Sequence, residues 1–327
     1  MKNIKFRSSY NLDISSFLNV MSADEYYVNF YRDEFEQFYP LLSNEIKSGY
    51  TAFLKSINRS NIAVALTTAI SLIENFNERD VKKLMVAQDE IEKNLYNAQY
   101  PDDLIEGLEM LPQFAGLIIQ LIQELEEHGF KKFWEDNRRP LAQKRIERLE
   151  VLFSKNKMLE KIEQYKKVQA EDVNVYVCTY AHPHGTKLFN DSLIIDYKWP
   201  DKAIINTFAH ELFHPPYNLE NVQKTIDLLK EKNFVKEAYD NQDPQIAYSP
   251  MEGFIEENIV EALGTFIAFS CGFEDEPYKY FQKHDSGSHV ISPYLFKYLS
   301  DNGIRKEQSF EEYFNDFVQK IDLIENS

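Results

Sequence analysis

The sequence predicts an α+β protein that is predominantly α-helical, in which a helical N-terminal region precedes a domain with a small sheet. Residues from about 10 to 168 show the apolar spacing of successive helices. Near residue 171 the pattern changes to two short runs rich in β-branched and aromatic residues, which predict strands. Helical spacing then returns and continues to about residue 325. We therefore expect two domains, 1–170 and 171–327.

Helices fill the first of these domains. Ser22 and Glu25 have the spacing of a capping box, which predicts a helix start. Pro101 and Gly129 are placed to begin and end a later helix. The predicted helices cover about 22–40, 41–57, 61–76, 79–97 and 101–128, followed by a charged amphipathic stretch at 130–168. No motif assigns a role to this all-helical domain.

Two strands open the second domain. Residues 174–180 and 193–199 are β-branched and aromatic, and the turn between them contains His182, Pro183 and His184. The proline makes the two histidines a poor metal pair, so we interpret them as turn residues. Helices are predicted at about 201–214, 218–233, 251–271, 293–301 and 309–325, with loops at 239–250 and 274–293.

The composition excludes several classes of partner. The chain has 327 residues, of which 43% are hydrophobic and 27% charged, as in soluble globular proteins. Its net charge of −17 argues against binding to nucleic acid or to an anionic membrane, because both need clustered cations. The apolar runs are far shorter than the ~20 residues that cross a bilayer, so no membrane span is predicted. The composition does not indicate an oligomeric state.

Cysteine usage and the first residues bear on the compartment. Cys178 and Cys271 are the two cysteines, and their distant positions in apolar runs predict buried free thiols. The start of the sequence lacks the continuous apolar core of a signal peptide. A cytoplasmic location is therefore favoured, with a secreted or periplasmic one if the chain is a processed form.

The motif that indicates a catalytic site is His-Glu-x-x-His, formed by His210, Glu211 and His214. It lies in a predicted helix that ends before Pro215 and Pro216. Two histidines four residues apart lie one above the other on a helix face, so their imidazoles can converge on one metal ion. The glutamate beside the first histidine is placed to take a proton from a metal-bound water. Because a catalytic zinc usually has three protein ligands, a third ligand is expected elsewhere.

The predicted helix at about 251–271 contains the best candidates for that third ligand. Glu257 and Glu261 are one helical turn apart and share a face. Gly264 and Ala268 continue this face with small side chains, while large apolar residues can point into the core. Such a helix can pack closely against another helix and aim its carboxylates at it.

The histidine motif and the downstream glutamate helix together resemble the zincin metallopeptidases, in particular their gluzincin branch, over residues 174–271. In that branch the ligand glutamate is often followed four residues on by an acid that hydrogen-bonds the first zinc histidine. The resemblance implies a zincin-like metallohydrolase domain with Glu257 as third ligand. It also implies that Glu261 fixes the tautomer of His210.

The spacing of the candidate ligands departs from that of the best-known gluzincins. Glu257 follows His214 after a longer insertion than many members of the branch show. A helix and a loop predicted within the insertion make this spacing feasible. Glu256 and Glu261 stay as alternative third ligands.

Two further parts of a zincin site are implied by the resemblance. Zincins carry a sheet whose edge strand lines the cleft and pairs with extended substrate backbone, and residues 188–196 are our candidate, with an ordinary core strand as the alternative. A transition-state oxyanion needs an electrophile beside the metal, usually His, Tyr or Arg. We prefer His289 for this role, ahead of His284, Tyr248 and Tyr294.

The function predicted from these residues is that of a zinc-dependent metallopeptidase with one Zn²⁺ ion and a peptide or protein substrate. His210, His214 and Glu257 bind the ion, and Glu211 acts as general base. One alternative is a catalytically inactive zincin-like protein that acts as a helical interaction module. Another is a chance match of the motif in a helical scaffold.

Overall fold

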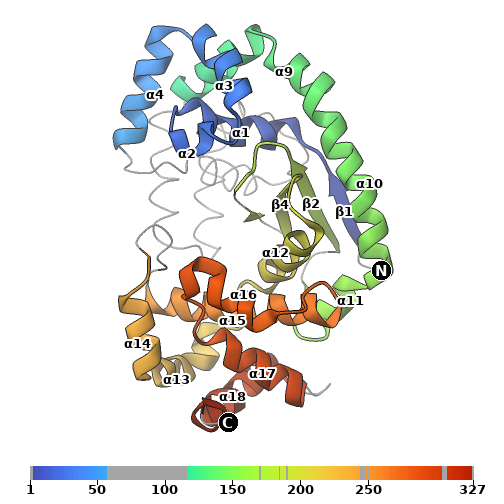
Figure 1. Cartoon of the computed structure of the whole chain (residues 1–327), viewed down its shortest axis with the longest axis vertical. Coiled ribbons are helices and arrows are strands. Elements are labelled where there is room, and N and C mark those ends of the chain that lie inside the picture. Colours follow the sequence, from blue (N-terminus) through green and yellow to red (C-terminus); the bar gives the residue numbers. More distant parts are fainter. Residues whose placement is uncertain are drawn as a thin grey trace. The chain divides into compact units, whose positions relative to one another are not determined.

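The computed structural model of the chain describes residues 3–56, 116–168, 171–183, 185–188, 191–243, 248, 250–303 and 308–325 (Figure 1). Most of the described part of the chain is helical, and the four strands within it form one mixed sheet, which confirms the predicted fold class. The predicted helices at 61–76 and 79–97, and the first part of the helix at 101–128, lie outside the described residues. Among the helices that the structure describes, none is both long and apolar enough to cross a membrane.

The chain divides into two compact units, and their boundaries differ from the predicted ones. Unit 1 comprises Met1–Glu150 and Ala170–Trp199, and unit 2 comprises Val151–Gln169 and Pro200–Ser327. The strands therefore group with the N-terminal helices, although the sequence suggested that they open the second domain. The reason is a strand near the N-terminus that the sequence analysis missed.

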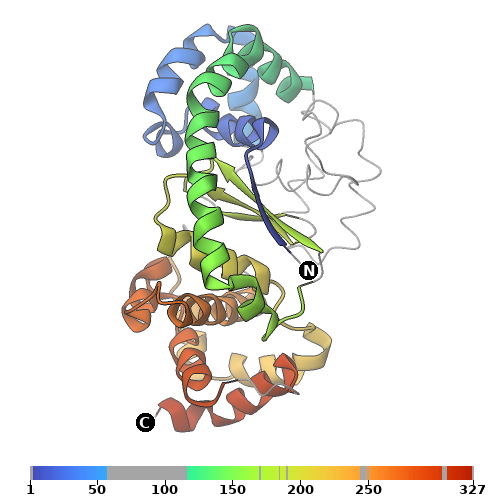
Figure 2. The same ribbon diagram turned by 90° about the vertical axis from the view of Figure 1, so that its right-hand side faces the viewer.

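Unit 1 contains the sheet (Figure 2), and the strand order is β1-β2-β4-β3. The missed strand β1 (Asn3–Arg7) pairs in parallel with β2 (Asp172–Cys178), and β2 pairs in parallel with β4 (Ser192–Asp196). The short β3 (Thr186–Leu188) closes the order in antiparallel pairing with β4. Only Ile4 and Phe6 alternate with polar residues in β1, a signal too short for a confident strand assignment from sequence.

The predicted cleft role of residues 188–196 does not hold for β4, which makes up most of that range. β4 lies between β2 and β3 in the sheet, and all five of its residues are buried. Because both of its backbone edges are already hydrogen-bonded to neighbouring strands, β4 cannot receive an extended substrate. It is the ordinary core strand that we considered as the alternative.

The helices of unit 1 surround an aromatic core. Phe17 stacks on Phe130 with ring centroids 4.4 Å apart, and Tyr180 lies 4.7 Å from Phe17. Buried Asp13 connects the helices to the segment that follows β2. Its carboxylate accepts hydrogen bonds from Trp134 Nε1 at 2.7 Å and from the Tyr180 amide at 3.1 Å. The helical elements are α1 (Tyr10–Met21), α2 (Glu25–Val28), α3 (Arg32–Phe38), η1 (Tyr39–Leu41), α4 (Asn44–Ser56), a helix over 116–127, α9 (Phe130–Phe133), the π-helical η2 (Trp134–Arg138) and α10 (Arg139–Asn156), whose last residues belong to unit 2.

Unit 2 is built from helices in its described part. The predicted helix at about 218–233 is confirmed, and a helix that was not predicted follows it over Asn233–Asp240. The predicted loop at 274–293 contains a helix that begins at Pro277, a residue suited to the first helical turn. Cys271 is half-buried, so the prediction of two buried thiols holds for Cys178 alone. The elements are α11 (Met158–Glu163), α12 (Asp201–Phe213), α13 (Leu219–Lys230), α14 (Asn233–Asp240), α15 (Met251–Ser270), α16 (Pro277–Lys283), η3 (His284–Gly287), α17 (Ser292–Asn302) and α18 (Phe310–Glu325).

Helices α12 and α15 pack against each other at very short range. A Cβ atom added to Gly264 of α15 would lie 3.1 Å from the backbone nitrogen of His210 and 3.2 Å from its Cα. Glycine therefore lets the α15 backbone approach α12 at the first motif histidine, as the small-residue face predicted. This contact sets the distance between the motif and the glutamates of α15.

We expect Gly264→Ala to lower the free energy of unfolding by about 1–3 kcal/mol, because the added methyl group meets backbone atoms that cannot move aside. Gly253→Ala is the matched control in the same helix, since its Cβ would meet nothing closer than Pro250 Cδ at 4.0 Å. This control gains helix propensity and should raise stability by about 0.5–1 kcal/mol. Urea denaturation measures both, and equal effects of the two substitutions would contradict the close packing.

Candidate metal centre

The two motif histidines converge, although one of them lies outside the helix. α12 ends at Phe213, and His214 has extended backbone angles (φ −72°, ψ 133°). A residue before proline is disfavoured in the helical region, so Pro215 explains why the helix ends here. His210 Nε2 and His214 Nε2 nevertheless lie 3.1 Å apart.

Glu257 completes a set of three convergent ligand atoms. Its Oε2 lies 3.4 Å from His210 Nε2, and its Oε1 lies 3.6 Å from His214 Nε2. Ligand atoms bound tetrahedrally at the usual zinc distances are separated by roughly 3.3 Å. Two imidazole nitrogens and a carboxylate at these separations are a donor set that fits Zn²⁺.

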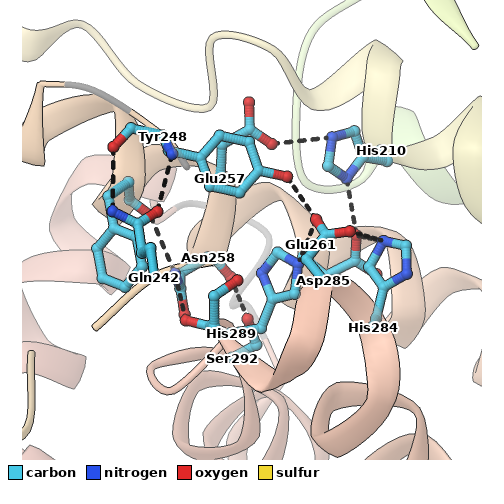
Figure 3. A network of polar contacts seen from close by, with 12 residues as sticks. His210, Gln242, Tyr248, Glu257, Asn258, Glu261, His284, Asp285, His289 and Ser292 are labelled. Atoms are coloured by element: carbon cyan, nitrogen blue, oxygen red, sulfur yellow. Dashed lines mark hydrogen bonds and ion pairs between the residues drawn. The ribbon is translucent and has the colours of Figure 1, made fainter. Parts of the chain in front are cut away.

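The other two candidate glutamates face the far side of the imidazole rings. Glu261 Oε2 lies 3.0 Å from His210 Nδ1 (Figure 3), and Glu256 Oε1 lies 2.9 Å from His214 Nδ1. A carboxylate on Nδ1 holds a histidine in the tautomer that leaves Nε2 free for a metal. The geometry thus favours Glu257 as third ligand and gives Glu256 and Glu261 an orienting position.

Glu261 is itself held by neighbouring side chains in the buried helix interface. Its Oε1 accepts hydrogen bonds from Asn206 Nδ2 and from Thr265 Oγ1, each at 3.0 Å. Burial acts to raise the pKa of Glu261, but the hydrogen bond with His210 and the charge of that ring lower it well below its usual range. Glu261 therefore stays ionised and fixes the orientation of His210.

Glu211 is positioned differently from these acids. It lies on α12, directly after His210 in the sequence, and is half-buried. Among the residues that the structure describes, none forms a hydrogen bond or ion pair with its side chain. Its carboxylate is therefore not engaged by another described side chain.

The residues predicted as electrophiles occupy different environments. His289 is only 1% exposed, and its Nε2 lies 3.2 Å from Asp285 Oδ2, so its burial argues against direct contact with a substrate oxyanion. The Tyr248 hydroxyl donates to the same Asp285 oxygen. Burial, and then the charges of Glu257 and Asp285, raise the pKa of Tyr248, which keeps its hydroxyl protonated. Tyr294 packs against Phe234.

His182 belongs to unit 1, apart from this set of side chains. Its Nδ1 accepts a hydrogen bond from Trp199 Nε1 at 3.3 Å, which agrees with a turn residue. His184 lies outside the described residues.

Three residues of this network were not predicted from the sequence. Asn206 lies one helical turn before His210, Thr265 one turn after Glu261, and Asp285 four residues before His289. For the first two, the i, i+4 relation on a predicted helix was a usable signal. For Asp285 the sequence predicted a loop, where this relation carries no information.

No family model, curated protein or solved structure matches the chain.

We expect Glu257→Ala to weaken zinc binding more than about 100-fold, because it removes a ligand. Glu256→Ala removes only the partner of His214 Nδ1 and should cost about 10–100-fold. Competition with a chelating dye measures both affinities. Exposed Glu220 supplies the control, Glu220→Ala, which should change nothing, and a larger loss from Glu256→Ala than from Glu257→Ala would reverse the assignment.

Zinc binding should strengthen as the pH rises. Burial acts to lower the pKa of His210, but its contacts with Glu257 and Glu261 outweigh burial and raise this pKa well above its usual value. The ion-free protein therefore keeps His210 protonated at neutral pH, and zinc must displace that proton. Calorimetric titration in two buffers of different ionisation enthalpy should show about one proton released per ion at pH 7. Identical heats in both buffers would contradict this.

Proposed function

We propose that this protein is a zinc-dependent metallopeptidase. The observation that carries the proposal is the convergence of His210 Nε2, His214 Nε2 and the Glu257 carboxylate at mutual distances of 3.1 to 3.6 Å. These three residues would hold the ion, which when bound supplies a Lewis acid and lowers the pKa of a coordinated water. The resemblance of the motif helix and the glutamate helix to gluzincins adds support for a peptide as substrate.

Glu211 serves as general base in this proposal. It is next to His210 in the sequence, is half-buried, and has no partner among the described side chains. It takes a proton from the attacking water and then delivers this proton to the leaving amine.

Tyr248 is better placed than His289 to donate a hydrogen bond to the developing oxyanion. Burial, and then the charges of Glu257 and Asp285, raise the pKa of Tyr248, so its hydroxyl stays protonated. The Tyr248 hydroxyl has one proton, which it donates to Asp285 (Figure 3). In this proposal the hydroxyl exchanges that hydrogen bond for one to the substrate oxygen, where it stabilises charge that appears only in the transition state.

We expect Glu211→Gln to retain zinc and to lose peptide hydrolysis by about 10²–10⁴-fold, because the amide cannot accept the proton. The measurements are metal content and digestion of a peptide library followed by mass spectrometry. Glu220→Gln, which changes an exposed glutamate of α13, is the control and should cleave like wild type.

Two results would contradict the proposal. If Glu211→Gln cleaves peptides as fast as wild type, Glu211 is not the base. If wild type binds zinc and cleaves no member of the library, the protein is better described as a non-catalytic metal-binding module.

A further inference from the structure

A second group of metal-ligating side chains lies in unit 2, beside the residues assigned to the peptidase site. A carboxylate oxygen of Glu261 and one ring nitrogen each of His284 and His289 lie within 4.8 Å of one another. Asp285 joins them, with Oδ2 3.2 Å from His289 Nε2 and Oδ1 3.8 Å from His284 Nε2. Figure 3 shows the carboxylates of Glu261 and Asp285 between the two imidazole rings.

The distances around His284 are those of ligands that share an ion. Its Nε2 lies 3.8 Å from Glu261 Oε2 and 3.8 Å from Asp285 Oδ1. Both separations are too long for hydrogen bonds. They fall in the range of about 3–4 Å that separates atoms bound to one ion at 2.0–2.2 Å. The imidazole thus faces two carboxylate oxygens that it does not directly contact.

His289 adds an independent observation. It is 1% exposed, and its Nε2 faces Asp285, at 3.2 Å from Oδ2. This separation also suits two atoms bound to one ion. A buried imidazole whose Nε2 lies beside a carboxylate can therefore contribute this nitrogen to a shared cation.

The backbone between the two histidines is held in an unusual conformation. Asp285 and Ser286 have positive φ angles of 44° and 54°, followed by Gly287 at 81°. Residues other than glycine rarely adopt such backbone angles, and each such residue costs about 1–3 kcal/mol. This turn leaves the rings of His284 and His289 nearly parallel, at 11°, with centroids 5.3 Å apart.

We propose that Glu261, His284, His289 and Asp285 form a second cation site, distinct from the His210–His214–Glu257 site. Two imidazoles and carboxylates favour a transition metal such as zinc over calcium or magnesium, which prefer oxygen ligands alone. Glu261 connects the two sites, because its Oε2 also lies 3.0 Å from His210 Nδ1. A second ion therefore holds the carboxylate that orients the first histidine.

The experiment is a count of zinc ions per chain by elemental analysis of the purified full-length protein after equilibration with zinc and removal of free metal. We expect two ions in wild type, one in His284→Ala, one in His214→Ala and none in the double variant. His128→Ala, which changes an exposed histidine of unit 1, is the matched control and should retain two. His284 is 40% exposed, so its substitution should leave the far-ultraviolet circular dichroism unchanged.

The possible outcomes separate this proposal from the proposed function. One ion in wild type and in His284→Ala, with none in His214→Ala, overturns the second site and leaves the peptidase site intact. One ion in wild type and in His214→Ala, with none in His284→Ala, supports the second site and overturns the first. Two ions in both wild type and His284→Ala also overturn the second site. If His284→Ala loses its native circular dichroism, His284→Gln repeats the count, with one ion expected and two overturning the site.

Discussion

The candidate site depends on the close approach of two helices. Gly264 lets the backbone of α15 lie so near His210 that a methyl group in its place would meet backbone atoms at 3.1 Å. At this distance, short carboxylate side chains on α15 reach both ring nitrogens of the motif histidine. A larger spacing would leave Glu257 and Glu261 too far from α12 to hold the imidazole. The positions of the candidate ligands therefore depend on packing at a residue that has no chemical role.

The three glutamates of α15 near this interface occupy two kinds of position relative to the histidine rings. Glu257 faces the Nε2 atoms of both histidines, whereas Glu261 and Glu256 each face an Nδ1 atom. The histidines are thus oriented from behind by charged partners while their remaining nitrogens converge. In a low-dielectric interface such contacts favour the ionised carboxylates, as the lowered pKa of Glu261 shows. The contacts with Glu257 and Glu261 raise the pKa of His210, so a zinc ion bound at its Nε2 atom would have to displace a proton.

Local sequence signals predicted the two helices that form the candidate site. They predicted the sheet of unit 1 and the turn at Asp285 less well. The helical spacing and the prolines located α12, and the paired acids with Gly264 indicated the face of α15 that meets it. The sheet was predicted less well, because β1 is five residues long and pairs with a strand more than 160 residues away. The burial of His289 and its pairing with Asp285 depend on a turn with positive φ angles at Asp285 and Ser286, which propensities do not anticipate.

The most direct test of the central claim is a crystal structure of the zinc-loaded protein with anomalous diffraction recorded at the zinc absorption edge. We expect an anomalous peak about 2.0–2.2 Å from His210 Nε2, His214 Nε2 and a Glu257 oxygen. Glu256 and Glu261 should remain on the Nδ1 atoms. An ion bound by Glu256 or Glu261 in place of Glu257, or the absence of a peak between the two histidines, would contradict it.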